Sequence, residues 1–137
     1  MEELFRKKSF IEDNLLILKE YLEFYELNKE DLKTFLAIKR LSEEIIESMI
    51  KVNQILLRKK MHFPVSYKKS FLDMKKFYGM KSVDLEEISK TAEFRNELAH
   101  EYQDMHEIYA IRNAKVILKL YPKYLKELLK IIKNDKN

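Results

Sequence analysis

The fold is decided by residues 35–56, which read FLAIKRLSEEIIESMIKVNQIL. Apolar side chains recur there at spacings of three and four, and this stripe consists of Phe35, Ile38, Leu41, Ile45, Met49, Val52 and Leu56. Because an α-helix has about 3.6 residues per turn, the spacing predicts a long amphipathic helix with one buried face. We expect it to start at the polar break of residues 28–31, with Asn28 as its capping residue, and to reach about Lys60.

A second long helix is predicted upstream, over residues 2–27. Its stripe consists of Ile11, Leu15, Leu18, Leu22 and Tyr25, and four more apolar side chains widen it, namely Phe10, Leu16, Phe24 and Leu27. A surface of this width serves either a core alone or a core together with a partner helix in a dimer. We expect the core, with the two long helices antiparallel.

Two shorter helices should follow. A loop around Pro64 precedes a helix from about Ser66 to Tyr78, and Gly79 is placed to end that helix in a left-handed conformation. Asp84, with Glu87 three residues later, has the spacing of a reciprocal cap that opens the next helix.

The last helix is predicted to start at a capping box over residues 104–107. One side of it carries Ile108, Ile111, Lys115, Leu118 and Tyr121, and the apolar line continues through Leu125, Leu128 and Ile132. Pro122 should kink or restart this helix because proline lacks the amide hydrogen that a helix interior needs. Residues 133–137 are expected to fray.

The composition places the chain in the all-α class. Its 137 residues include one glycine and two prolines, too few for the turns of a many-stranded β protein. We therefore predict a four- to five-helix up-and-down bundle with a long closing helix, forming one domain over residues 1–137. The absence of cysteine excludes disulfides and thiolate sites. We expect no metal, no cofactor and no membrane span, and a cytoplasmic protein.

Residues 94–102, FRNELAHEY, set an arginine, a histidine and a tyrosine close together. Cleavage of a phosphodiester inside RNA needs a proton acceptor, a proton donor and positive charge on the phosphorane, which histidine and arginine supply without a metal. Five residues on a regular helix correspond to about 140° of rotation, so Arg95 and His100 would lie on different faces. Either the helix ends near Ala99 or a second copy completes the site.

Two interpretations of these residues remain open. Arg95 and His100 can be an ordinary surface arginine and a helix-end histidine. Against this, Arg95 follows Leu85, Ile88 and Ala92 on one helical line, and an arginine on an apolar face needs a partner or a ligand. His106 is expected to be a surface residue of the last helix's first turn.

Arg-Asn-x-x-x-His-x-Tyr, filled by Arg95, Asn96, His100 and Tyr102, resembles the signature of the HEPN superfamily, and in particular of the HepT-like toxins of type VII-like MNT/HEPN toxin–antitoxin systems. The resemblance implies a metal-independent endoribonuclease that acts as a homodimer with the two motifs facing each other. It assigns catalysis to Arg95 and His100 and phosphate positioning to Asn96. It also implies a partner nucleotidyltransferase that silences the toxin by adding AMP to Tyr102.

Alternatives to this function stay open at the level of sequence. Tyr102 can instead be a packed aromatic or a side chain that stacks on RNA. The chain can be a non-catalytic helical subunit that binds a nucleotide or the nucleotidyltransferase, or a helical interaction protein without a nucleic-acid role. A dimer that binds RNA without cutting it would favour the non-catalytic binding subunit. A chain that binds neither RNA nor nucleotides would favour the interaction protein.

The positive charge is concentrated in the middle of the chain. The net charge is +4, yet residues 51–81 alone carry nine basic side chains and one acidic side chain. The nine are Lys51, Arg58, Lys59, Lys60, Lys68, Lys69, Lys75, Lys76 and Lys81. This segment is either a phosphate-attracting surface or a solvated lysine-rich face.

Overall fold

The computed structural model describes residues 2–81, 83–98 and 106–134. It contains α1 (Glu2–Leu27), α2 (Leu32–Lys59), α3 (Tyr67–Tyr78), α4 (Leu85–Leu98) and α5 (His106–Asn134), and these residues form no strand. The all-α helical bundle with a long closing helix is therefore confirmed. None of the described helices is both long enough and apolar enough to cross a membrane.

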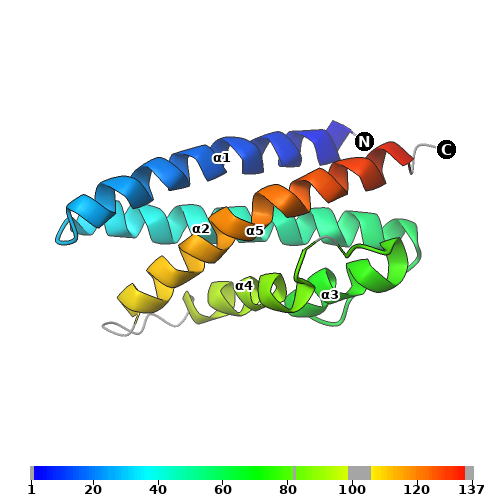
Figure 1. Cartoon of the computed structure of the whole chain (residues 1–137). Helices are drawn as coiled ribbons and strands as arrows, with labels where there is room; N and C mark the ends of the chain where they lie inside the picture. The colour runs from blue at the N-terminus through cyan, green and yellow to red at the C-terminus, as the bar shows by residue number, and fades with distance from the viewer. Residues whose placement is uncertain (1, 82, 99–105, 135–137) are drawn as a thin grey trace.

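The three long helices lie lengthwise along one another, with α1 antiparallel to α2, and α3 and α4 pack on the other side of α2 (Figure 1). The beginning of α1 and the end of α5 lie at one end of the bundle, and the end of α4 and the beginning of α5 lie at the other. Arg95 and Asn96, on the last turn of α4, thus lie toward the end where α1 turns into α2.

The stripe of α2 forms the centre of the core, as its periodicity predicts. Ile38, Ile45, Met49, Val52 and Leu56 are buried, and Phe35 and Leu41 are partly buried against them. Each such side chain contributes roughly 1.5–3 kcal/mol relative to leaving it exposed. The core therefore explains why so long a helix is stable at this place in the chain.

The broad stripe of α1 divides into two parts. Ile11, Leu15, Leu18, Leu22 and Tyr25 are buried, as predicted. The four widening side chains, Phe10, Leu16, Phe24 and Leu27, are exposed, so the prediction that they join the core is wrong. The reason is that α1 packs mainly on α2 and α5, and no other described element covers its outer flank.

The start of α2 also differs from the prediction. Its N-cap is Asp31, whose Oδ1 accepts a hydrogen bond from the amide of Thr34 at 3.3 Å. Asn28 instead completes α1, because its amide donates to the carbonyl of Tyr25 and its Nδ2 to the carbonyl of Phe24, both at 3.0 Å. Both residue types can cap a helix, and the direction of their hydrogen bonds decides which end each one serves.

The predicted ends of α3 and the start of α4 are confirmed. The Ser66 Oγ accepts from the amide of Lys69 at 3.1 Å, and Gly79 closes α3 with a left-handed φ of 67°. At the start of α4 the Asp84 Oδ1 accepts from the amide of Glu87 at 3.0 Å, while the Glu87 carboxylate pairs with Lys119.

Helix α5 departs from the prediction in two respects. It runs through Pro122 without a restart, because buried residues such as Tyr121 and Leu125 anchor the turns on both sides. In its first half the buried side chains include Ala110, Ala114 and Ile117, whereas Ile108 is 70% exposed and Lys115 is exposed. Small alanines let α5 approach its neighbours closely, and that determines which face is buried. In the second half Leu125, Leu128 and Ile132 are buried, as predicted.

Candidate active site

The motif spans the junction between α4 and α5. Arg95 and Asn96 lie on the last turn of α4, which is described to Leu98, and α5 begins at His106. His100 and Tyr102 lie outside the described residues, as does Asp104 of the predicted capping box. What the structure establishes is therefore how the two helix ends that flank these residues are held.

The helical line that leads to Arg95 is apolar, as predicted. Leu85, Ile88 and Ala92 are buried, and so is Phe94, the residue before Arg95. Ser89 and Thr91 are buried as well, because α4 packs against α2, α3 and α5. Most of the circumference of α4 is therefore covered, which holds the backbone of its last turn in place.

A stacked aromatic pair joins the end of α4 to the start of α5. The rings of Phe94 and Tyr109 have centroids 5.2 Å apart and planes within 9°. Such a pair contributes about 0.5–1.5 kcal/mol beyond the burial of its area. The pair therefore brings the residue before Arg95 into contact with the first turn of α5.

Hydrogen bonds inside the core fix α4 on α5 and α5 on α2. The Thr91 and Tyr121 hydroxyls are 2.8 Å apart, and burial raises the pKa of Tyr121 well above its usual range. One turn further, the Tyr124 hydroxyl donates to the side-chain oxygen of Asn53. Such bonds are directional, so they fix how the helices are rotated as well as how closely they approach.

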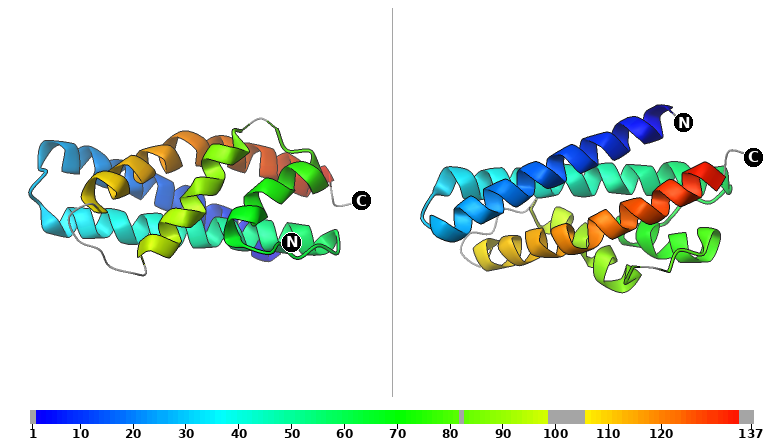
Figure 2. Two further views of the ribbon diagram at one scale, coloured as in Figure 1. Left: turned by 90° about the horizontal axis from the view of Figure 1, so that it is seen from below. Right: turned by 45° about the horizontal axis from the view of Figure 1, so that its top comes forward.

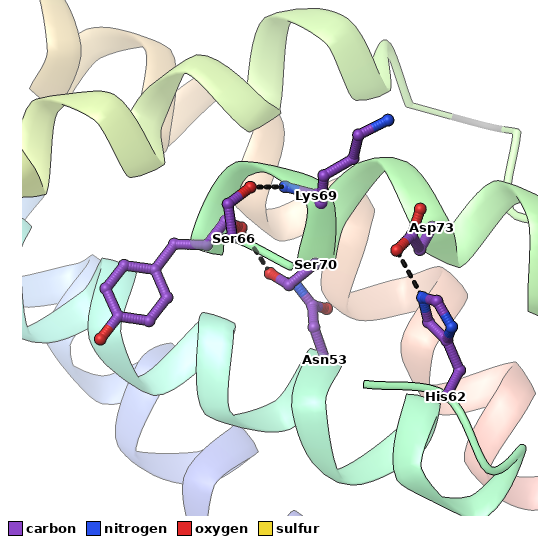
Figure 3. Close-up of polar contacts among 7 residues, drawn as sticks. Asn53, His62, Ser66, Lys69, Ser70 and Asp73 are labelled. Atoms are coloured by element: carbon purple, nitrogen blue, oxygen red, sulfur yellow. Dashed lines mark hydrogen bonds and ion pairs between the residues drawn. The ribbon is translucent and has the colours of Figure 1, made fainter. Parts of the chain in front are cut away.

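The same network continues into α3, as Figure 3 shows. The Asn53 Nδ2 donates to the Ser70 Oγ at 3.3 Å, and the Ser70 hydroxyl donates to the carbonyl of Tyr67 at 2.7 Å. All of these side chains except Tyr67 are buried. Helix α4 is thus positioned by a chain of buried polar contacts that includes α2, α3 and α5.

The start of α5 is also held on the end of α1. The Tyr25 hydroxyl donates to the Glu107 carboxylate, and burial together with that hydrogen bond raises the pKa of Tyr25 to about 12. Lys115 forms an ion pair with Glu26 at 3.1 Å. Beside these contacts a cleft of about 460 Å³ opens between the two helices, and Arg112 and Lys29 line it.

Asn113 is a buried polar residue that the sequence did not single out. It lies one turn after Tyr109 and is 9% exposed, and its Nδ2 has no hydrogen-bond partner in the described part of the chain. The available signal was an asparagine within an alanine-lined face of α5. Phe94 and Tyr109 were missed as well, because two aromatics fifteen positions apart carry no recognisable spacing.

His62, outside the motif, is held by other contacts. Its Nε2 lies 2.6 Å from the Asp73 Oδ2 (Figure 3). Its ring stacks on Phe77, with centroids 4.3 Å apart. Within residues 2–81, 83–98 and 106–134, no three His, Asp or Glu side chains gather as metal ligands would. His106 lies in the first turn of α5, as predicted.

A comparison with protein families matches the segment of the chain that contains the motif. A family model described as ribonuclease HepT-like matches residues 11–132, a range that contains Arg95, Asn96, His100 and Tyr102. A comparison with curated proteins finds no match. Because the match spans most of the sequence, the chain belongs to the HepT-like ribonuclease family.

Proposed function

We propose that this protein is a metal-independent endoribonuclease and the toxin of a type VII-like HEPN/MNT toxin–antitoxin system in the cytoplasm. The observation that carries the proposal is the family match over residues 11–132, which includes the complete Arg-Asn-x-x-x-His-x-Tyr motif. The contacts of Phe94 with Tyr109 and of Tyr25 with Glu107 support it, because they hold both helix ends that flank the motif.

In the proposed reaction the RNA 2′-oxygen attacks the adjacent phosphorus and the bond to the 5′-oxygen breaks. A neutral His100 imidazole takes the proton from the 2′-hydroxyl, and a protonated imidazole gives a proton to the leaving 5′-oxygen. Arg95 holds the non-bridging oxygens and stabilises the negative charge of the phosphorane. The products are a 2′,3′-cyclic phosphate and a 5′-hydroxyl, and no metal or external reagent is consumed.

A homodimer supplies the second imidazole. One subunit has a single His100, whereas the reaction uses a base and an acid, so two motifs that face each other would provide one imidazole for each role. Asn96 would position the phosphate or the opposing motif through its amide. The exposed apolar flank of α1, with Phe10 and Phe24, shows that this chain keeps apolar surface available for a partner.

The proposed partner is a nucleotidyltransferase that uses Tyr102 as its acceptor. The Tyr102 hydroxyl would attack the α-phosphate of ATP, so that AMP is transferred and pyrophosphate leaves. The new phosphodiester carries a negative charge beside Arg95 and His100 and would occupy the position of the RNA phosphate. That charge gives the modification a physical means of silencing the enzyme.

Cleavage by Arg95→Ala tests the motif against a matched control. Arg40 on α2 is an exposed arginine paired with Glu44, so Arg40→Ala removes the same charge from another place. We expect Arg95→Ala to lower the cleavage rate about 10²- to 10³-fold and Arg40→Ala to leave it unchanged. Wild-type activity in Arg95→Ala, or products that end in a 3′-hydroxyl, would show that the mechanism is wrong.

Coexpression with the cognate nucleotidyltransferase tests the acceptor. Mass analysis should find added AMP on the wild-type chain and on Tyr21→Phe, in which an exposed tyrosine of α1 is changed. Tyr102→Phe should remain unmodified. Stoichiometric AMP on Tyr102→Phe would exclude this tyrosine as the acceptor.

A further inference from the structure

The outward face of α3 is lined with lysines. Lys68 and Lys75 are seven residues apart, as are Lys69 and Lys76, so each pair spans two helical turns and about 10 Å along the axis. Lys69, Lys75 and Lys76 are exposed and Lys68 is partly exposed. The opposite face, with Phe71 and Met74, is buried. The lysines therefore form two rows on the side of α3 that faces away from the core.

The carboxylates near these rows are unevenly placed. Asp73 is the one acidic residue of the segment 51–81, and it is bound to His62. Glu93 of α4 pairs with Lys68 at 3.0 Å, and Asp84 and Glu86 line a cleft together with Lys75. The excess positive charge of the rows is therefore greatest at Lys69 and Lys76.

Two exposed aromatic rings lie near the start of α3, Phe63 beside Arg58 and Tyr67 in a small cleft with Glu47 and Lys51 of α2. Phe63, in the loop between α2 and α3, is 66% exposed, and the Arg58 guanidinium lies 6.0 Å from its ring centre. Tyr67, the first residue of α3, is 40% exposed. Exposed aromatics beside a positive surface are the platforms on which single-stranded nucleic acids stack their bases.

This surface reaches the helix that carries the motif arginine. The ion pair between Lys68 and Glu93 joins the first turn of α3 to α4, two residues before Arg95. Helices α3 and α4 lie side by side in both the first view and the view from below (Figure 2). The start of α3 thus lies beside the part of α4 that precedes Arg95.

We propose that the α3 surface, defined by Lys68, Lys69, Lys75 and Lys76 with Phe63 and Tyr67, binds the part of a single-stranded RNA that adjoins the cleaved phosphate. The lysines hold consecutive phosphates, and the two rings stack on bases. The position of this strand relative to cleavage rests on the proposed ribonuclease function. The binding itself does not, so it is measured on a chain that cannot cut.

The first experiment measures the affinity of a His100→Ala protein for a short labelled single-stranded RNA by fluorescence anisotropy over a range of salt. We expect charge reversal at Lys69, Lys75 and Lys76 to weaken binding at least about tenfold. Each lost phosphate contact should lower the slope of log affinity against log salt by about 0.7, or about 2 for the three. These side chains are exposed, so the fold should be retained, which thermal unfolding will check.

The matched control reverses three exposed lysines elsewhere, Lys19 on α1 and Lys123 and Lys130 on α5. Both triple variants change the net charge equally, so the comparison separates a bound surface from the general field of the molecule. We expect the control to lose no more than about threefold and to keep its salt slope. Equal losses in the two variants, or no loss in either, would overturn the proposal.

The aromatic part is tested by substitution and crosslinking. Phe63→Ala and Tyr67→Ala should each weaken RNA binding about fivefold or more, and Tyr67→Phe should restore it. Leu36→Ala, at a half-exposed apolar residue of α2, should have no effect. Photocrosslinking with 4-thiouridine RNA should mark Phe63 or Tyr67. Crosslinks confined to other elements would contradict the inference. So would α3-surface variants that lose their complex with the nucleotidyltransferase but keep their affinity for RNA.

The two proposals fail separately. If the wild-type chain does not cleave RNA but the His100→Ala protein binds it through the lysine rows, the α3 surface stands and the ribonuclease mechanism falls. If cleavage depends on Arg95 and His100 while the α3 variants bind RNA normally, the ribonuclease mechanism stands and the α3 surface falls.

Discussion

Helices α1 and α4 are held in the bundle by different interactions. The buried residues of α1 are Leu4, Ile11, Leu15, Leu18, Leu22 and Tyr25, which are apolar apart from one hydroxyl. Helix α4 buries Ser89 and Thr91 as well as apolar residues, and Thr91 is hydrogen-bonded to α5. Apolar contacts are non-directional, whereas a buried hydrogen bond is lost when a helix rotates. Helix α4, which carries Arg95, is therefore fixed in orientation by a buried hydrogen bond at its middle, whereas α1 has its hydrogen bond to Glu107 at its last turn.

The largest expected effect on stability is in α1. Leu18→Ala removes a fully buried side chain and leaves a cavity, so we expect a loss of about 2–5 kcal/mol in the free energy of unfolding. Denaturant unfolding measures it. The rate of RNA cleavage per folded molecule should stay unchanged, and a parallel loss of that rate would show that α1 also positions the site.

The hydrogen bond from Tyr25 of α1 to Glu107 should make stability depend on pH. Because the pKa of Tyr25 is raised to about 12, the folded chain keeps a proton that the unfolded chain loses above its ordinary value of 10.0. Stability is therefore complete below pH 10 and falls as the pH rises from 10 to about 12.

Tyr25→Phe tests this contribution by urea unfolding between pH 9 and 12. The free energy of unfolding of the variant should fall less at alkaline pH than that of the wild type. It should still fall in part, since burial also raises the pKa values of Tyr121 and Tyr124. An identical alkaline decline in the variant and the wild type would show that Tyr25 does not contribute.

In α4 the expected cost in stability is smaller and the effect on cleavage is greater. Thr91→Val leaves the Tyr121 hydroxyl without its partner, which should cost about 1–2 kcal/mol. Because the orientation of α4 also changes, we expect a measurable fall in the cleavage rate at temperatures where the variant is fully folded. A double-mutant cycle with Tyr121→Phe measures the coupling between the two hydroxyls. Additive effects would mean that this bond does not hold α4.

The smallest effect should come from the surface of α1. Lys8 and Glu12 form an ion pair at 3.1 Å on one face of the helix, and the Glu12 side chain is 48% exposed. Lys8→Ala should change stability by no more than about 0.5 kcal/mol, since exposed pairs are screened by water and salt. A loss above 1 kcal/mol in the free energy of unfolding, measured by thermal unfolding, would show that Lys8 makes a further stabilising contact.

Periodicity predicted most of the helices because it depends on neighbours within a few turns. The bounds of α1 and the ends of α3 follow from apolar spacing and from capping residues such as Ser66 and Gly79. Periodicity did not show which flank of α1 would be covered or which face of α5 would be buried. Both depend on where other helices pack, and alanines such as Ala110 carry little periodic signal.

The sequence named the candidate site residues but not the contacts that support them. The motif gave Arg95, Asn96, His100 and Tyr102 directly, and the structure puts the first two on the last turn of α4. The contacts of Phe94 with Tyr109 and of Thr91 with Tyr121 join positions fifteen and thirty residues apart. Such pairings are set by the packing of α4 on α5, which no local spacing records.

The proposed cleavage of RNA by this motif without a metal can be tested directly. Purified wild-type protein, shown to be free of AMP on Tyr102, and His100→Ala should be incubated with total tRNA and a structured messenger RNA in EDTA, followed by analysis of the product ends. We expect the wild type to cleave RNA and leave 2′,3′-cyclic phosphates, and we expect a rate about 10²- to 10⁴-fold lower for His100→Ala. Cleavage at equal rates by both proteins, or by neither, would contradict it.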